Sequence, residues 1–169
     1  MRWMISDQRK RTVETVRSIS ISDLRRWGFL KESKSGIITW FSYDDLHVSI
    51  ETRIPVVVEA WGSVRFRYDL KKRETGVIES FDYLSVLSGE RCHFGGFRWH
   101  FGCPMPQKEG GFNRVCARQV RTLYLRGDYF GCRHCYDLTY ARCQFGHHFT
   151  EPHHRYSGMR PRLMSCKLK

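Results

Sequence analysis

Cys132-Arg133-His134-Cys135 is the stretch from which the fold can be worked out, because two cysteines separated by two residues supply one half of a tetrahedral zinc site. The other half has to come from elsewhere, and Cys103 and Cys116 are the candidates. Fifteen residues lie between Cys116 and Cys132, which is enough for a β-hairpin that brings its two ends together. This spacing is typical of a zinc ribbon.

The hairpin can be followed in the sequence. Gln119 to Leu125 alternates in the manner of a half-buried strand, Arg126-Gly-Asp128 is typical of a turn, and Tyr129-Phe130-Gly131 leads back to the second cysteine pair. On the first side, twelve residues separate the cysteines where about two to four are usual. A long loop costs only slightly more entropy to close than a short one. We therefore predict one structural zinc ion held by Cys103, Cys116, Cys132 and Cys135.

Other roles for the cysteines are open at this point. The chain has seven cysteines, an odd number, and the polar start Met1-Arg-Trp-Met-Ile-Ser-Asp is not the core of a signal peptide. Disulfides are therefore disfavoured, a reducing cytoplasmic compartment is expected, and inert buried thiols remain the alternative. Cys92 could replace Cys103 or Cys116, but Pro104 makes the turn after Cys103 rigid. Four thiolates leave no position for water, so the site would be structural.

Several motifs, mostly in the C-terminal half, resemble a family of small bacterial zinc-ribbon-like proteins. The matching residues are Cys92-His-Phe-Gly-Gly-Phe-Arg-Trp99, Phe101-Gly-Cys103-Pro104, Cys116-Ala-Arg-Gln-Val120, Leu123-Tyr-Leu125 and Phe130-Gly-Cys-Arg-His-Cys-Tyr-Asp-Leu-Thr-Tyr140, with a weaker echo in Leu24-Arg-Arg-Trp-Gly28 and Gly36-Ile-Ile-Thr-Trp40. The resemblance implies a zinc-ribbon-like protein of bacteria and of mobile elements, without an assigned activity. Family members continue into a long basic helix, whereas Gly146-His-His-Phe-Thr-Glu-Pro-His-His154 interrupts any such helix here.

Length and charge bound the class of protein. A chain of 169 residues with 41% apolar residues can build one domain, or one domain and a small metal module, and it has no apolar run long enough to cross a bilayer. We predict a helix and an antiparallel β domain over residues 1–91, the zinc-ribbon module over 92–142, and a basic, histidine-containing tail over 143–169. The formal net charge is +12, of which residues 92–169 carry +9.

Arginines alternate with aromatic residues around the cysteines. Ten of the thirteen basic residues after position 91 are arginine, which can bind a phosphate through two hydrogen bonds, while aromatic rings can stack on bases. The same arginines could instead solvate a surface while the aromatics build a small core. We predict that the contacts with nucleic acid, DNA or RNA, or with another partner, are made by Arg118, Arg121, Arg126, Arg133, His134, Tyr136 and Arg142.

The N-terminal half favours strands. Residues 8–19 are compatible with a helix or with an extended basic arm, and Ser20 or Ser22 can cap a short helix that ends at Gly28. β-branched and aromatic residues then predict strands at Gly36 to Phe41, Leu46 to Thr52, Val56 to Trp61, Ser63 to Leu70 and Val77 to Leu87. The expected fold class is α+β and β-rich, with a short N-terminal helix, an antiparallel sheet and then a zinc ribbon. Arg65 and Arg67 should share one exposed face of the sheet.

No catalytic constellation is recognisable. The sequence lacks a nucleophile elbow, a phosphate loop and a dinucleotide fingerprint, and Asp44-Asp45 beside His47 is ordinary for a turn, so a metal-dependent nuclease is the weakest alternative. A second metal site is conceivable in the tail, although an exposed histidine-rich segment is the preferred interpretation. Its candidate ligands are Cys143, His147, His148, His153 and His154.

The sequence thus predicts a zinc-stabilised accessory or regulatory protein that binds nucleic acid and is not an enzyme. The alternative is a protein-binding adaptor or inhibitor that docks on a larger nucleoprotein complex, such as a polymerase or a bacterial defence complex. A basic surface suits either partner, because its field attracts polyanions without selecting a particular one. No membrane association is expected.

Overall fold

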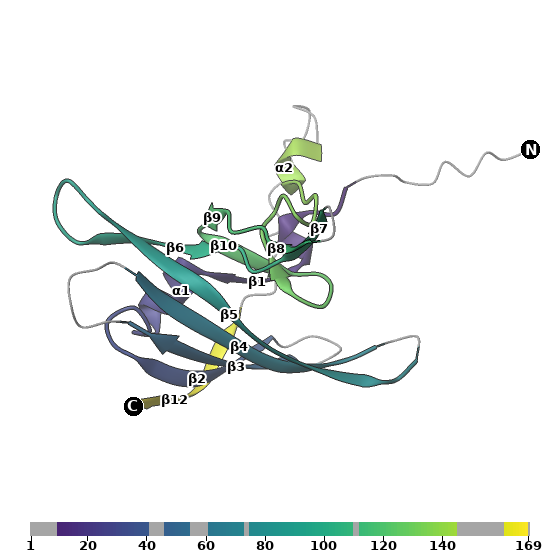
Figure 1. The fold of residues 1–169 in the computed structure, drawn as a ribbon, viewed down its shortest axis with the longest axis horizontal. Coiled ribbons are helices and arrows are strands. Elements are labelled where there is room, and N and C mark those ends of the chain that lie inside the picture. Colours follow the sequence, from purple (N-terminus) through teal and green to yellow (C-terminus); the bar gives the residue numbers. More distant parts are fainter. Residues whose placement is uncertain are drawn as a thin grey trace, which may run out of the picture.

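Strands dominate the part of the chain that the computed structural model describes, which is residues 10–40, 46–54, 61–72, 75–109, 112–144 and 161–168 (Figure 1). The helical elements of this part are η1 (Val13–Thr15), α1 (Ile21–Arg26) and α2 (Ala141–Gln144). Its strands are β1 (Arg17–Ser20), β2 (Lys34–Trp40), β3 (Leu46–Arg53), β4 (Trp61–Lys71), β5 (Ile78–Arg91), β6 (Phe97–Gly102), β7 (Pro106–Glu109), β8 (Phe112–Val115), β9 (Gln119–Val120), β10 (Thr122–Leu125), β11 (Phe130–Gly131) and β12 (Arg162–Leu168).

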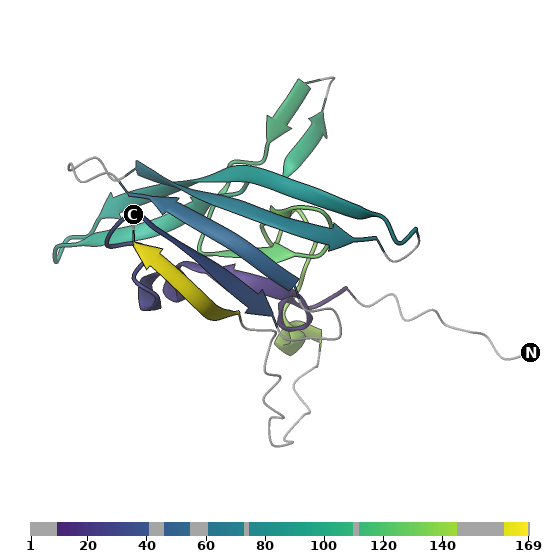
Figure 2. The same cartoon turned by 90° about the horizontal axis from the view of Figure 1, so that it is seen from below.

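The strands form two packed layers. A seven-stranded antiparallel sheet, in the order β12-β2-β3-β4-β5-β6-β9, makes the larger layer. The smaller antiparallel sheet, β1-β10-β11, packs on one face of it together with α1 (Figure 1). A third unit, the β7–β8 hairpin, projects from the edge of the large sheet, as the green pair of strands in Figure 2 shows.

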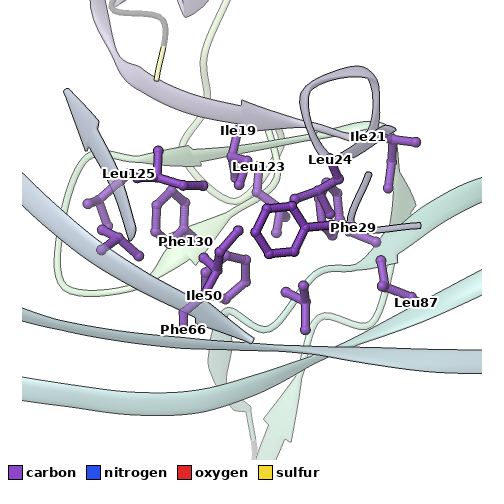
Figure 3. Close-up of a cluster of buried hydrophobic side chains, with 14 of the residues drawn as sticks. Ile19, Ile21, Leu24, Phe29, Ile50, Phe66, Leu87, Leu123, Leu125 and Phe130 are labelled. Carbon is purple, nitrogen blue, oxygen red and sulfur yellow. The ribbon is translucent and has the colours of Figure 1, made fainter. Parts of the chain in front are cut away.

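One apolar core joins the two layers. Along β4, Val64 and Phe66 are fully buried while the alternate residues are exposed or half-buried, as expected for a sheet with one covered face. Phe66 stacks on Phe130 of β11 with ring centroids 4.9 Å apart. Ile19 and Leu123 reach the same core from the small sheet (Figure 3). Burial of each such side chain stabilises the fold by about 1.5–3 kcal/mol.

The predicted α+β class is wrong, because helices contribute only three, six and four residues to the described part of the chain. The short helix α1 begins directly after Ser20, one of the two caps expected for it. Ser20 and Asp23 form a reciprocal capping box. Residues 17–20 are nevertheless a strand rather than helix or free arm. They pair with β10 and place Ile19 opposite Leu123 in the core, so tertiary pairing outweighs local propensity.

The zinc ribbon of the prediction is not confirmed as a separate unit. The expected strand from Gln119 to Leu125 is interrupted at Arg121, where the chain passes from β9 in the large sheet to β10 in the small sheet. β10 is buried on both faces rather than half-buried, since Leu123 enters the main core and Tyr124 packs against Val16. The hairpin with β11 pairs only two residues of each strand.

The other expected strands are found within about two residues at most ends, as β2, β3, β4 and β5, except for the longer C-terminal end of β5. The predicted strand from Val56 to Trp61 lies outside the described residues apart from Trp61. Asp44, Asp45 and the four tail histidines also lie outside them. None of the described helices has the length and apolar character of a membrane span.

The predicted boundary at residue 91 falls between β5 and β6, which pair with each other in the large sheet. The main core also contains residues from both sides of that boundary. The predicted division of the chain into three regions, with boundaries at residues 91 and 142, stays a prediction.

Candidate metal centre

Four cysteine thiols lie close together beside the main core. The sulfurs of Cys103, Cys116, Cys132 and Cys135 are all within 4.8 Å of one another. The Sγ–Sγ distance is 3.9 Å from Cys103 to Cys135 and 3.5 Å from Cys132 to Cys135, well beyond the roughly 2 Å of a disulfide. The cluster could therefore hold a metal ion. Cys92, the alternative ligand, lies in the β5–β6 turn and is not part of this group.

The β7–β8 hairpin supplies the first pair of thiols. Cys103 precedes β7 and Cys116 follows β8, so β7 and β8, which pair with each other, lie between the two cysteines (Figure 2). At the base, the Cys116 N–H donates to the Met105 carbonyl and the Ala117 N–H to the Cys103 carbonyl, each at 2.9 Å. Ala117 reverses the chain with a φ of 52°. The unusual spacing is thus an inserted hairpin whose ends meet.

The second pair sits on a tight turn directly after β11. The Tyr136 N–H donates to the Cys132 carbonyl at 3.3 Å, and the Leu138 N–H donates to the Arg133 carbonyl at 2.9 Å. Asp137 has a φ of 46°, which lets the chain leave the turn toward residues 10–13. The two halves of the site touch through the Cys132 N–H, which donates to the Cys103 sulfur at 3.1 Å.

Backbone N–H groups control the ionisation of two of the thiols. Burial alone would raise the pKa of Cys132, but hydrogen bonds from Cys135, from the His134 N–H and from Arg118 bring that pKa down to about 7. Burial raises the pKa of Cys103 to about 11, against opposing hydrogen bonds from the N–H groups of Met105 and Cys132. Burial also raises the pKa of Cys135. The same N–H groups would offset the negative charge of thiolates bound to a cation.

Arg118 lies at the cluster itself. Its Nη1 is 3.6 Å from the Cys132 sulfur, and its carbonyl accepts the Cys103 N–H at 2.9 Å. The neighbouring thiols raise the pKa of the guanidinium, Cys132 first. The sequence pattern singled out Arg118 as a contact for a partner, and that role stays a prediction.

The remaining predicted contact residues are spread around the cluster. Arg121, Arg126, His134 and Arg142 are exposed, and Arg133 is half-buried with its guanidinium 5.3 Å from the centroid of the Tyr140 ring. Tyr136 differs from them, because it is half-buried and its hydroxyl donates to the Tyr129 carbonyl and accepts the Gly127 N–H. Through these two hydrogen bonds Tyr136 stabilises the turn between β10 and β11.

Two tyrosines of the large sheet also position this region, and sequence reasoning missed them. The Tyr68 hydroxyl donates to the Asp128 carbonyl at 2.7 Å, and the Tyr83 hydroxyl accepts the Phe130 N–H at 2.8 Å. The two hydroxyls are 2.8 Å apart, and burial raises the pKa of both. Their partners are 60 and 47 residues away in the chain, so no local pattern could have identified them.

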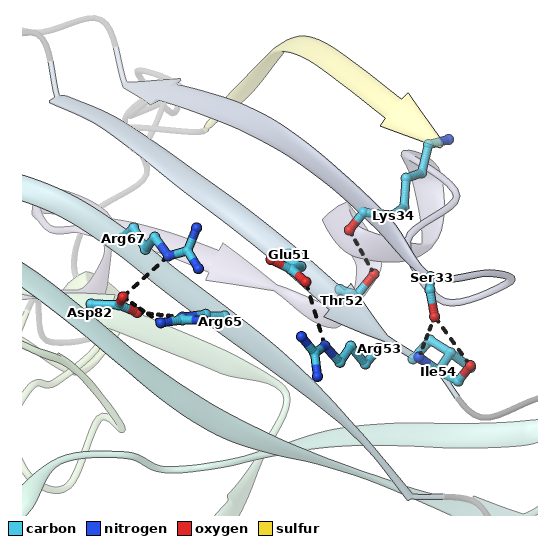
Figure 4. A network of polar contacts seen from close by, with 9 residues as sticks. All are labelled: Ser33, Lys34, Glu51, Thr52, Arg53, Ile54, Arg65, Arg67 and Asp82. Atoms are coloured by element: carbon cyan, nitrogen blue, oxygen red, sulfur yellow. Dashed lines mark hydrogen bonds and ion pairs between the residues drawn. The ribbon is translucent and has the colours of Figure 1, made fainter. Parts of the chain in front are cut away.

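The exposed face of the large sheet has a different electrostatic character. As predicted, Arg65 and Arg67 share this face, but both pair with Asp82, at 2.6 and 3.2 Å. Arg53 pairs with Glu51 at 3.5 Å (Figure 4). These three arginines of β3 and β4 are therefore largely neutralised by neighbouring carboxylates.

Comparison with protein-family models, with curated proteins and with solved structures gives no match for this chain. The resemblance of its C-terminal motifs to a bacterial zinc-ribbon-like family stays a prediction.

Proposed function

We propose that this protein is a zinc-stabilised nucleic-acid-binding accessory protein and not an enzyme. The observation that carries the proposal is a contrast between two sets of arginines. Arg53, Arg65 and Arg67 of β3 and β4 are paired with carboxylates, whereas Arg121, Arg126 and Arg142 form no ion pair with any described carboxylate, although Arg126 donates to the Tyr136 carbonyl at 3.2 Å. Unpaired, exposed guanidinium groups are the ones available to phosphate.

Zinc suits the donor set. A tetrahedral zinc ion with Zn–S bonds of about 2.3 Å separates its sulfurs by about 3.8 Å, and the separations of 3.5 and 3.9 Å lie close to that value. Cys103, Cys116, Cys132 and Cys135 would be its ligands. When bound, the ion would hold the base of the β7–β8 hairpin against the turn after β11. Its contribution would be rigidity, because four protein ligands leave no position for substrate.

A salt titration tests the nucleic-acid proposal. Binding of the full chain to a duplex and to a single-stranded oligonucleotide should weaken log-linearly with salt, with a slope of about 0.7 to 0.9 per phosphate neutralised. The double variant Arg121→Gln/Arg142→Gln should lower that slope by about 1.4 on the single strand and by about 1.8 on the duplex. The matched control Arg65→Gln/Arg67→Gln removes two exposed but paired arginines and should change the slope much less. Absence of binding at low salt contradicts the proposal.

The alternative function, an adaptor or inhibitor that docks on a larger nucleoprotein complex, is favoured by a separate observation. Leu84 and Val86 are 61% and 51% exposed next to each other on the outer face of β5, with paired charges beside them. An apolar centre with a polar rim is typical of protein interfaces. Co-purification before and after nuclease treatment separates the two functions, since only an adaptor retains its protein partner after digestion.

A further inference from the structure

The turn between β5 and β6 presents an isolated aromatic side chain. Phe94, in the middle of the turn at residues 92–96, is 98% exposed, more than any other large apolar residue that the structure describes as exposed. The turn reaches one end of the molecule in both views (Figures 1 and 2). A single exposed apolar side chain is common on protein surfaces, so the case for a ligand rests on what surrounds Phe94.

Two backbone hydrogen bonds close this turn. The Cys92 N–H donates to the Gly96 carbonyl and the Gly95 N–H to the Cys92 carbonyl, both at 3.0 Å. Gly95 and Gly96 have φ values of 87° and 76°, in the left-handed region that favours glycine. The aromatic side chain is therefore presented by a preorganised turn, which lowers the entropy lost on binding.

The stem below the turn is anchored in the fold. β5 and β6 pair in register from Leu87 opposite Phe101 to Arg91 opposite Phe97. Trp99 is only 9% exposed and belongs to the main core, and Nη2 of Arg25 in α1 lies 3.4 Å from the Phe97 carbonyl. The tip is thus a direct extension of two strands of the large sheet.

The surroundings of Phe94 are basic. Arg91 and Arg98 are exposed at the end of the stem and form no ion pair with a described carboxylate, although Glu90 stands opposite Arg98 in the register. The His93 ring lies edge-on to Phe94 with centroids 5.2 Å apart. Arg91 stands opposite Phe97 and Arg98 opposite Glu90, so the two arginines project from opposite faces of the stem, one on each side of the tip. This arrangement suits a base on the ring with a phosphate on either side of it. A membrane-inserting tip would carry further large apolar side chains, and here the next two residues are glycines.

We infer that an unpaired base of a single-stranded nucleic acid stacks on Phe94 while Arg91 and Arg98 contact the neighbouring phosphates. The inference rests on the proposed nucleic-acid function and adds to it a second contact area, distant in sequence from the arginines around the cysteine cluster. It also gives a role to Cys92-His-Phe-Gly-Gly96, a motif that the metal centre does not use.

The test is binding of the full chain to a single-stranded oligonucleotide that contains 2-aminopurine, whose fluorescence reports stacking. Phe94→Ala should weaken binding about 5- to 150-fold and leave the salt slope unchanged, because stacking on a neutral ring is worth ~1–3 kcal/mol. Phe94→Tyr should retain affinity and the fluorescence change. Arg98→Gln should lower the salt slope by about 0.7. The control Ile78→Ala removes a 65% exposed side chain at the other end of β5 and should have no effect.

The outcomes separate the two proposals. If the wild-type chain binds the oligonucleotide and Phe94→Ala binds equally well with the same fluorescence, the stacking role is overturned and the nucleic-acid function stands. If the wild-type chain binds no oligonucleotide at low salt, the proposed function fails and the stacking role fails with it. Binding to vesicles of phosphatidylcholine and phosphatidylglycerol that depends on Phe94, without oligonucleotide binding, overturns both. Circular dichroism of Phe94→Ala should match the wild type, because the side chain is exposed.

Discussion

The backbone N–H of Cys132 donates a buried hydrogen bond to the sulfur of Cys103 at 3.1 Å, across 29 residues of sequence. This contact ties the turn after β11 to the base of the β7–β8 hairpin. It also places a hydrogen-bond donor on a sulfur that burial would otherwise disfavour as a thiolate. The two halves of the cysteine cluster are therefore connected by the polypeptide as well as through any ion that they hold.

Zinc content should follow the cluster and not the total number of cysteines. We expect one zinc ion per chain by native mass spectrometry, and its loss in Cys116→Ser with a lower unfolding temperature, because structural zinc contributes folding free energy. Cys92→Ser is the control, since Cys92 lies outside the cluster. A variant without Cys92 that loses zinc would show that the ligand set is wrong.

The β7–β8 hairpin should be dispensable for metal binding. Replacing residues 107–114 with Asn-Gly leaves Pro106 and Val115 joined by a two-residue turn that suits a hairpin. The hydrogen bonds of Cys116 and Ala117 at the base remain possible. The shortened chain should bind one zinc ion as the full chain does. Loss of zinc together with retained circular dichroism would mean that the hairpin itself holds the ligands in place.

Tyr83 should contribute to stability through its two hydrogen bonds, one with the Phe130 N–H and one with the Tyr68 hydroxyl. In Tyr83→Phe the Phe130 N–H loses its acceptor, and an unsatisfied buried donor costs about 1–3 kcal/mol. Urea unfolding at neutral pH measures the change in the free energy of unfolding. Tyr140→Phe is the matched control, because Tyr140 is 46% exposed, and it should stay within about 0.5 kcal/mol of the wild type. Equal stability of both variants would remove the proposed role of Tyr83.

Asp82 should make stability depend on pH in the acid range. Its pKa is lowered by hydrogen bonding to Arg65 first, and by the charges of Arg65 and Arg67, against some desolvation. Because the folded pKa lies below the unfolded one, the stabilisation is present above the unfolded pKa and is lost as the pH falls through the folded pKa. The free energy of unfolding of Asp82→Asn should therefore decrease less than that of the wild type when the pH falls from about 6 to about 2. An unchanged pH profile would contradict this.

The order of local elements was largely readable from the sequence. Alternating apolar residues such as Val64, Phe66 and Tyr68 predicted the strand β4, and Ser20 was one of the two caps predicted for α1. The spacing of Cys132 and Cys135 predicted a tight turn, because two ligands separated by two residues favour one local geometry. These signals act between residues close in the chain.

The sequence did not predict which distant segments of the chain pair or pack with each other. Alternation from Gln119 to Leu125 predicted a strand but not that β9 and β10 belong to different sheets, nor that Tyr124 is buried like Leu123. Residues 17–20, which were expected to be helix or an extended arm, form a strand for the same reason, because β10 offers them a partner.

The sequence by itself determined which residues are chemically able to form this site, namely four thiols and a surplus of arginine. The tertiary structure alone decided that Cys103 and Cys116 meet through an inserted hairpin, that Arg65 and Arg67 are neutralised by Asp82, and that Phe94 stands uncovered at a tip. The physical reason is that ligand chemistry belongs to single side chains, whereas proximity, neutralisation and exposure depend on every segment that packs around them.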